Sequence, residues 1–236
     1  MVAVVFGSSG GVGRALAEAL VARGGYARVF AVSRSGAGVE GAEALEADFL
    51  DEAALARAAE VIGAGGPVGL CIVASGILSD GEGLQPEKSY RQQSKEAFER
   101  VFAANTIAPA LIAKHMLPLM PRAERSVFAA LSARVGSITD NRLGGWHAYR
   151  ASKAALNMLV RNYAIEQARR APGAICVGLH PGTVDTGLSK PFQSGVSKEK
   201  LFTPEVSAGY LLDVIDRLGP EDSGKCFDWA GKEVPA

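Results

Sequence analysis

Residues 1–14 read Met1-Val-Ala-Val-Val-Phe-Gly-Ser-Ser-Gly-Gly-Val-Gly-Arg14, and the pattern of these residues is the strongest indication of the fold. The apolar run 1–6 passes into a glycine-rich turn and then into a segment with Val12, Leu16 and Leu20 at helical spacing. Strand, glycine turn and helix in this order are typical of a dinucleotide-binding site. Glycines let backbone N–H groups approach a pyrophosphate, and the positive end of the helix dipole then faces the phosphates.

The glycine spacing is Gly7-x3-Gly11-x-Gly13 rather than the commoner G-x-G-x-x-G. Glycines alone are also found in ordinary tight loops, so the cofactor interpretation depends on the strand before them and the helix after them. We expect the phosphates to contact this turn, through Gly7, Ser8, Ser9, Gly11, Val12 and Gly13.

The composition excludes several classes of function. The 236 residues carry 25 basic and 25 acidic side chains, so no net charge attracts nucleic acid or an anionic membrane. No apolar run approaches the roughly 20 residues of a membrane span, and Met1 leads directly into the first strand, so we expect a cytoplasmic protein. The three cysteines, Cys71, Cys176 and Cys226, are far apart, which supports neither a disulfide framework nor a metal site.

Apolar runs alternate with helical patterns along the rest of the chain. Strands are predicted at 27–32, 44–49, 68–74, 127–131, 174–179 and 225–229, and helices after Asp51, at 94–117, at 148–169 and after Thr203. This order predicts an α/β fold: a single-domain Rossmann fold over residues 1–236, with a doubly wound parallel sheet of about seven strands. Residues 1–130 would form the cofactor half, and residues 131–236 the catalytic and substrate half.

Ligands of such sheets collect at the carboxyl ends of the strands. The second strand ends at Ser33-Arg34, where a guanidinium replaces the usual acid and favours a 2′-phosphate, hence NADP(H) over NAD(H). The alternative is a solvated loop arginine. Asp48-Phe49 is placed to contact adenine, although Asp48 is also suited to capping the next helix. Ala74-Ser75-Gly76 permits close approach to a ribose.

Tyr149 and Lys153 are four residues apart near a helix start and therefore share one face. A phenol with its ordinary pKa of about 10 is a poor acid–base group at neutral pH. A neighbouring ammonium favours the phenolate and lowers this pKa. The pair follows a loop, residues 135–147, that leaves the predicted cofactor site, so we expect it to exchange a proton with an alcohol or carbonyl oxygen.

The glycine pattern, the Tyr149/Lys153 pair and Pro181-Gly-Thr-Val-Asp-Thr186 after the sixth strand occur in the order of one known family. Across essentially the whole chain, the sequence resembles the short-chain dehydrogenases/reductases. The segments 134–138, Gly144-Gly145 and 149–157 are further similar to the C-factor-like and sniffer-like carbonyl reductases.

The resemblance implies an NADP(H)-dependent oxidoreductase that transfers hydride between nicotinamide and a small carbonyl or secondary alcohol. It implies that Tyr149 is the proton donor, that Lys153 lowers its pKa and binds the nicotinamide ribose, and that the Asn105 carbonyl holds a relay water. Pro109 has no N–H to occupy that carbonyl. The cofactor carboxamide is expected at the segment containing Pro181, Gly182, Val184 and Thr186. The two long helices, 94–117 and 148–169, pair subunits in many relatives, so the resemblance implies a homodimer or homotetramer.

One departure concerns the family's catalytic serine. Alignment without gaps places Ala133 at its position, with Ser132 one residue early. Ser132 is the favoured replacement, and Ser137 and no serine at all are the alternatives. The departure also keeps open a second function, an NADP(H)-binding sensor or signalling protein with little or no turnover.

The remaining candidate residues can be interpreted either as structural residues or as parts of the functional site. His115 and His180 lack partners at metal-ligand spacing and are interpreted as packed or capping residues. Trp146 and His147 either line the substrate pocket or support the helix start. The segment 189–201 is either a substrate lid or an ordinary long loop, and its place after the carboxamide segment favours the lid.

Overall fold

The computed structural model describes residues 1–80, 83–195 and 197–236, and its centre is one eight-stranded sheet. The strand order is β10-β9-β6-β5-β4-β1-β2-β3. All paired strands are parallel except β10, which runs antiparallel to β9 at the edge. The bounds are β1 Val2–Phe6, β2 Arg28–Ser33, β3 Glu43–Glu46, β4 Val68–Val73, β5 Ser126–Leu131, β6 Ala174–His180, β9 Cys226–Asp228 and β10 Glu233–Val234.

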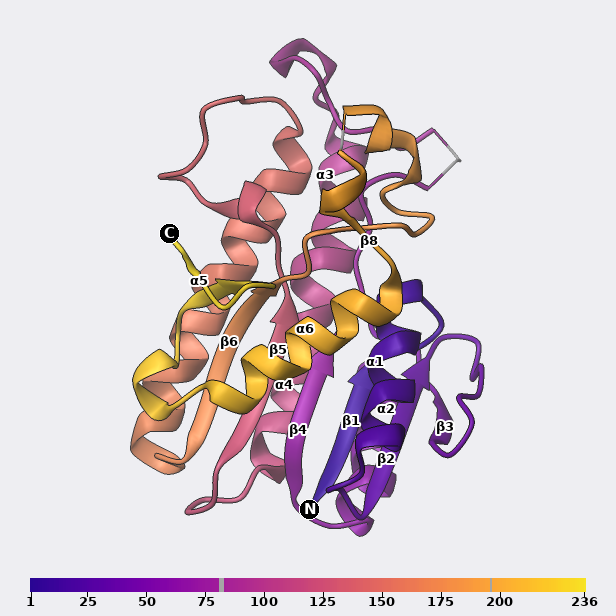
Figure 1. Ribbon diagram of the computed structural model, residues 1–236, viewed down its shortest axis with the longest axis vertical. Helices are drawn as coiled ribbons and strands as arrows, with labels where there is room; N and C mark the ends of the chain where they lie inside the picture. Colours follow the sequence, from indigo (N-terminus) through magenta and orange to yellow (C-terminus); the bar gives the residue numbers. More distant parts are fainter. Residues whose placement is uncertain (81–82, 196) are drawn as a thin grey trace.

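Helices cover both faces of the sheet (Figure 1). Helices α1 (Gly11–Arg23) and α6 (Pro204–Arg217) lie on one face, and α2 (Glu52–Ala64), α4 (Ala108–Met116) and α5 (His147–Arg170) on the other. Helix α3 (Lys95–Phe102) precedes α4. A second sheet contains only β7 (Thr183–Val184) and β8 (Leu201–Phe202). Short 3-10 helices span Tyr90–Gln92, Leu117–Leu119, Arg134–Gly136, Lys190–Gly195, Lys198–Lys200 and Pro220–Asp222.

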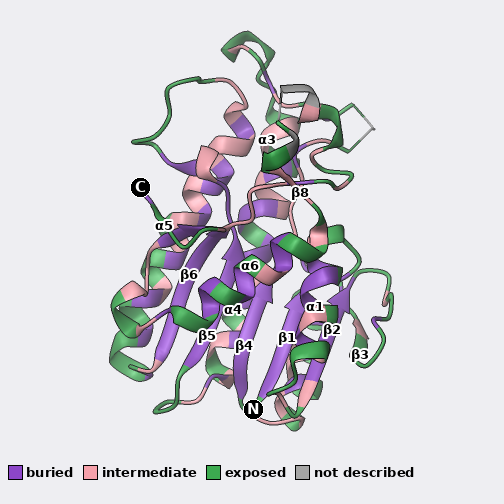
Figure 2. Ribbon diagram, viewed as in Figure 1, coloured by how far each residue is buried: buried purple, intermediate pink, exposed green. Residues whose placement is uncertain are grey.

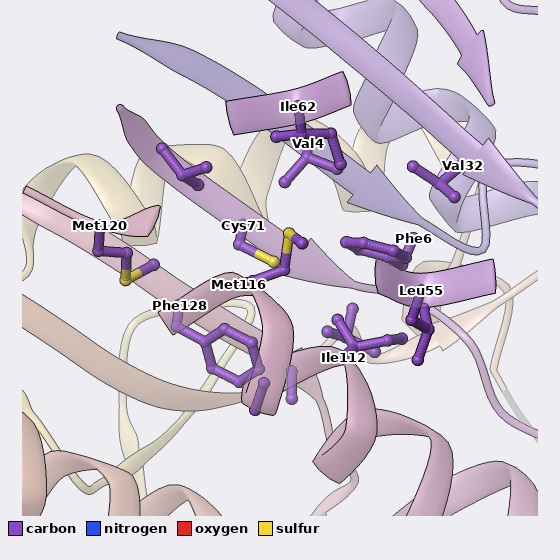
Figure 3. Close-up of a cluster of buried hydrophobic side chains, with 14 of the residues drawn as sticks. Val4, Phe6, Val32, Leu55, Ile62, Cys71, Ile112, Met116, Met120 and Phe128 are labelled. Carbon is purple, nitrogen blue, oxygen red and sulfur yellow. The ribbon is translucent and has the colours of Figure 1, made fainter. Parts of the chain in front are cut away.

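The central strands are buried on both sides, as Figure 2 shows. Successive side chains point to opposite faces, so Val4 and Phe6 join the core under α2 and α4 while Ala3 and Val5 join the core under α1 and α6. Figure 3 shows the first of these cores, where strand residues pack against Leu55 of α2. Two-sided burial explains why the strands read as continuous apolar runs.

The predicted α/β architecture is confirmed, with three local corrections. The sheet has an eighth strand, the antiparallel edge strand β10. Strand β3 ends at Glu46 rather than at 49, because the Phe49 ring turns inward and contacts Phe6 edge-to-face, with ring centroids 5.7 Å apart. The helix predicted over 94–117 is interrupted by a π-helical turn at Ala103–Ile107, just before Pro109.

Candidate active site

A cavity of about 760 Å³ opens at the carboxyl ends of the central strands. Its walls come from the glycine turn before α1, the ends of β4, β5 and β6, the start of α5, and the segment after β7. The predicted site residues that line it are Ser9, Gly11, Val12, Gly13, Ala74, Ser75, Gly76, Ser132, Tyr149, Lys153, Pro181, Gly182, Val184 and Thr186. Segments far apart in the sequence are therefore brought together as expected for this fold.

Three glycines of the turn, Gly7, Gly11 and Gly13, have no room for a side chain. A Cβ on Gly13 would lie 2.2 Å from the Gly7 carbonyl oxygen, and one on Gly11 would lie 2.7 Å from Cγ2 of Thr186. Gly7 has a φ of +89°, and a Cβ there would lie 2.8 Å from the Ser75 nitrogen. The backbone at this turn is consequently bare toward the cavity.

The same turn offers unpaired polar groups. The N-cap of α1, Gly10, supplies no side-chain hydrogen bond to the first turn of the helix. The Ser8 and Ser75 hydroxyls are buried and have no hydrogen-bond partner among the described residues. Bare N–H groups and free hydroxyls at a helix N-terminus fit the phosphate and ribose of a dinucleotide.

The residues predicted to bind the adenosine end of the cofactor lie at the ends of β2 and β3 and do not line this cavity. Ser33 is buried, and its hydroxyl accepts a hydrogen bond from the Ala37 N–H. Arg34 is exposed, and no described residue bonds to its guanidinium. Asp48 accepts a hydrogen bond from Leu50 N–H, whereas the cap of α2 is Asp51, which accepts from Ala53 N–H. Asp48 therefore does not cap the helix.

Asn105 is fully buried in the π-helical turn. Its side-chain oxygen accepts from Ile77 N–H at 2.8 Å, and its amide nitrogen donates to the Ile77 carbonyl and to Ser152 Oγ. The Ala108 N–H reaches back to the Ala103 carbonyl, five residues earlier. Proline at position 109 cannot donate to the Asn105 carbonyl, so this turn locally replaces the α-helical pattern.

Tyr149 and Lys153 lie on one face of α5, at the cavity wall. Lys153 is buried and its Nζ donates to the Leu131 carbonyl at 2.7 Å. The same nitrogen lies 5.8 Å from the centre of the Tyr149 ring. The two residues are therefore neighbours without a direct hydrogen bond between them.

The protein around the pair shifts both pKa values. Burial lowers the pKa of Lys153 to about 8, and the nearby Cys226 slightly opposes this shift. Burial also raises the pKa of Tyr149 to about 12. The expected lowering of the Tyr149 pKa by Lys153 is therefore wrong, because burial raises it. The reason is that desolvation penalises both charged forms, while the ammonium is held by Leu131.

Helix α5 starts at an unusual cap. Its N-cap, Trp146, has a left-handed backbone with φ +52° and provides no side-chain hydrogen bond. The buried carboxylate of Glu87 instead accepts from Ala148 N–H through both oxygens at 3.3 Å, and the Glu87 carbonyl accepts from Trp146 N–H. No local sequence signal points to this cap, because Glu87 lies in a loop 61 residues before Ala148.

Trp146 lines the cavity and contacts two of its other aromatic side chains. Its ring contacts Tyr149 edge-to-face with centroids 6.2 Å apart, and Phe192 with centroids 5.2 Å apart. Phe192 belongs to the segment 189–201 that was predicted as a lid, and it lines the cavity. Residue 196 of that segment lies outside the described residues.

The residues considered for the role of the family's catalytic serine lie near the end of β5. Ser132 and Ala133 both line the cavity, and the Ser132 hydroxyl donates to Asn157 Oδ1 at 2.6 Å. The Ser137 hydroxyl is buried elsewhere and accepts from Asp140 N–H. His180, interpreted from the sequence as a packed residue, also lines the cavity. The sequence signal that could have placed His180 in the cavity is its position at a strand end, directly before Pro181-Gly182.

Other chemistry has little support in the described residues. The three cysteines are buried and unbonded, and burial raises the pKa of each thiol. Within residues 1–80, 83–195 and 197–236 no group of three His, Cys, Asp or Glu side chains is arranged to hold a metal ion. None of the helices described in those ranges has the length and apolar character needed to cross a membrane.

Comparisons with known proteins agree with this geometry. The C-signal protein of Myxococcus xanthus is 40% identical over 136 residues, covering 58% of this chain and 76% of that protein. A 1-hydroxy-2-glutathionyl-2-methyl-3-butene dehydrogenase of Rhodococcus sp. strain AD45 is 35% identical over 130 residues, 55% of this chain but only 54% of that protein.

The fold also matches a solved structure. The NADPH-bound carbonyl reductase from chicken fatty liver superposes with a TM-score of 0.85 at 27% identity, covering 100% of this chain and 98% of that one. The family model for short chain dehydrogenases matches residues 1–197. This chain is therefore an oxidoreductase of the short-chain dehydrogenase family.

Proposed function

We propose that this protein is an NADP(H)-dependent carbonyl reductase in which Tyr149 is the acid–base residue. The observation that carries the proposal is that Tyr149 and Lys153 lie in the same cavity wall as the bare glycine turn. The NADPH-bound state of the chicken carbonyl reductase supports the choice of cofactor. The exposed, unpaired guanidinium of Arg34 at the end of β2 supports preference for the 2′-phosphorylated form.

The bound cofactor would supply or accept the hydride. Tyr149 donates its phenolic proton to the oxygen of the carbonyl substrate as that oxygen gains negative charge. Lys153, whose Nζ donates to the Leu131 carbonyl, would bind the ribose through its remaining donors, and its positive charge would stabilise the phenolate left behind. Val184 and Thr186 would hold the carboxamide; both line the cavity, and Thr186 lies against Gly11 of the glycine turn.

The walls favour an uncharged, apolar substrate. Leu78, Val135, Trp146 and Phe192 line the cavity near Tyr149. The nearest guanidinium in the lining, that of Arg134, is already bonded to Asp140 and Asp228, each at 2.8 Å. A substrate carboxylate would have to displace one of these acids, so we infer that neutral ketones, aldehydes, quinones and dicarbonyls are preferred.

The test is NADPH oxidation by the purified protein across a panel of such carbonyl compounds. Tyr149→Phe should lower kcat by at least about 10²-fold while NADPH still binds, because only the proton donor is removed. Tyr163→Phe is the matched control, since Tyr163 lies on the same helix but packs against Phe128. Retained turnover in Tyr149→Phe would refute the role. Binding of NADPH with no turnover in the wild type would favour the sensor alternative.

We also propose a homodimer or homotetramer formed through α4 and α5. Ile107, directly before α4, and Met158 and Ile165 on α5 are 48%, 61% and 44% exposed, which is high for such apolar residues. Met158→Glu should dissociate the assembly in sedimentation velocity. A monomeric wild type would contradict the proposal.

A further inference from the structure

The starting point is the missing serine, and the inference rests on the proposed function. Ala133 stands where the family's serine would hold the substrate oxygen. A serine hydroxyl has a single donor, and that of Ser132 is already used at 2.6 Å on Asn157. Ser137 does not line the cavity. Neither serine near the end of β5 therefore offers a free donor beside Tyr149.

His180 is the neighbouring polar residue on the same face of the sheet. The Ser132 N–H donates to the Leu179 carbonyl, so the end of β5 lies beside the end of β6. A Cβ on Gly178 would lie 3.3 Å from Asn157 Oδ1, which shows that this face of β6 looks at α5. His180 is two residues further along the strand and points to the same face.

The position of His180 relative to α5 follows from the rise per residue of the strand and of the helix. Asn157 lies beside Gly178, and two strand residues advance about 6.6 Å. One helical turn, about 5.4 Å, leads from Asn157 to Lys153, and one more to Tyr149. The imidazole of His180 is therefore level with the part of α5 that carries the two proposed active-site residues, and it lines the same cavity.

The protonation state of the ring suits a hydrogen-bond donor. Burial lowers the pKa of His180 to about 4, helped by Arg134 and opposed by Asp228, so the ring is neutral at physiological pH. Nδ1 is buried and has no partner among the described residues. A proton on Nδ1 would be a buried donor without an acceptor, so we assign the proton to Nε2.

We propose that His180 contacts the substrate and that its Nε2–H donates a hydrogen bond to the substrate carbonyl oxygen, replacing the absent serine hydroxyl. Tyr149 and His180 then approach the oxygen from α5 and β6 respectively. The neutral ring supplies a fixed donor without adding a charge to an apolar cavity, so the oxygen is oriented and its developing charge stabilised.

The first measurement does not require turnover. Carbonyl-labelled acetophenone is bound to the protein with NADP⁺, and the C=O stretching band is recorded by difference infrared spectroscopy. A donated hydrogen bond lowers this frequency, so His180→Phe should move the band back toward its value in an apolar solvent, whereas Ser132→Ala should leave it in place. An unchanged band in His180→Phe would overturn the proposal.

The second measurement is kinetic. His180→Phe should lower kcat by about 10²-fold with NADPH affinity unchanged, since one oxygen-binding donor is lost. His180→Gln, which keeps an amide donor, should retain more activity and guards against loss of folding in the Phe variant. Adding Ala133→Ser to His180→Phe should recover at least about tenfold by restoring the family's serine.

The outcomes separate the two proposals. Tyr149-dependent turnover that is unaffected by His180→Phe would refute the role of His180 and leave the proposed function standing. Equal loss in His180→Phe and His180→Gln without rescue by Ala133→Ser would also refute it, because a packing role predicts that pattern. Turnover that survives Tyr149→Phe would instead refute the proposed function.

Discussion

Lys153 shows how burial governs the chemistry of a single residue. Its side chain is almost completely inaccessible, and burial lowers its pKa from an ordinary 10.5 to about 8. Between these two values the unfolded chain binds a proton that the folded protein does not. The free energy of unfolding therefore receives a contribution from Lys153 that rises with pH across this window.

We predict that this contribution disappears in Lys153→Met. The stability of the wild type relative to the variant should rise by about 2 kcal/mol between pH 8 and pH 10. The raised pKa of Tyr149 acts in the opposite direction, because that group contributes stability below pH 10 that is lost only as pH approaches 12. The buried thiols and the Tyr149 phenol, whose pKa values are raised, are present in both proteins, so the difference between wild type and variant isolates the lysine.

Urea denaturation at several pH values measures this difference. Lys95→Met is the control, since Lys95 is 79% exposed and interacts only with Glu99 one turn later. It should follow the wild type at every pH. A constant difference between wild type and Lys153→Met would show that the folded protein keeps the lysine charged throughout the window.

At the scale of elements, the start of α5 depends on a residue of another loop. Glu87 satisfies the Ala148 N–H that Trp146 leaves unpaired, and its carbonyl fixes the Trp146 backbone. Trp146 in turn contacts Phe192 and Tyr149. The loop around residue 87 therefore sets both the helix that carries Tyr149 and one wall of the cavity.

Glu87→Ala should cost about 1–2 kcal/mol of stability, the usual loss for a helix cap, and should raise KM for the carbonyl substrate at least fivefold. Affinity for NADPH should change less than KM, because the glycine turn proposed to bind the phosphates is not among the hydrogen-bond partners of Glu87. Glu87→Gln keeps a carbonyl acceptor and should recover most of the loss.

Tryptophan fluorescence reports the effect directly. The chain has two tryptophans, so a Trp229→Phe background leaves Trp146 as the only emitter. Its emission should shift in Glu87→Ala and not in Glu87→Gln. Identical spectra in all three proteins would mean that Glu87 does not position the wall.

These elements also mark what the sequence could predict. Apolar runs located the strands, and Thr203-Pro204 and Asp51 began helices as expected, because these signals are local. The missing N–H of Pro109 was visible in the sequence, whereas the form of the interruption, a π-helical turn at Ala103–Ile107, was not. The Glu87 cap could not be predicted, since it depends on which loops meet in space. The direction of the Tyr149 pKa shift was missed because burial, which dominates it, is not visible in a local motif.

At the scale of the whole molecule, the proposed cofactor site is built from both halves of the chain. Gly11 of the first turn lies against Thr186, and Gly7 against Ser75 at the end of β4. A dinucleotide bound here would contact both the 1–130 and the 131–236 halves. Its binding free energy should therefore be added to the stability of the complete fold rather than of one half.

Thermal unfolding with NADPH at about 100 times its Kd should consequently show one transition, stabilised by about 2.7 kcal/mol. For a chain of this size that corresponds to an increase in Tm of roughly 5–10 °C. NADH at the same concentration should give a smaller increase, because it lacks the 2′-phosphate that Arg34 is proposed to bind. Arg34→Asp should reduce the NADPH shift, and it should leave the cofactor-free Tm almost unchanged since Arg34 is exposed.

Arg217→Asp controls for the change of charge, because Arg217 is also exposed but lies at the last residue of α6. It should keep the full difference between NADPH and NADH. If Arg34→Asp kept that difference as well, the 2′-phosphate would have to be bound elsewhere. Two separate transitions, only one of them moved by NADPH, would instead show that the halves unfold independently and that the cofactor is held by one of them.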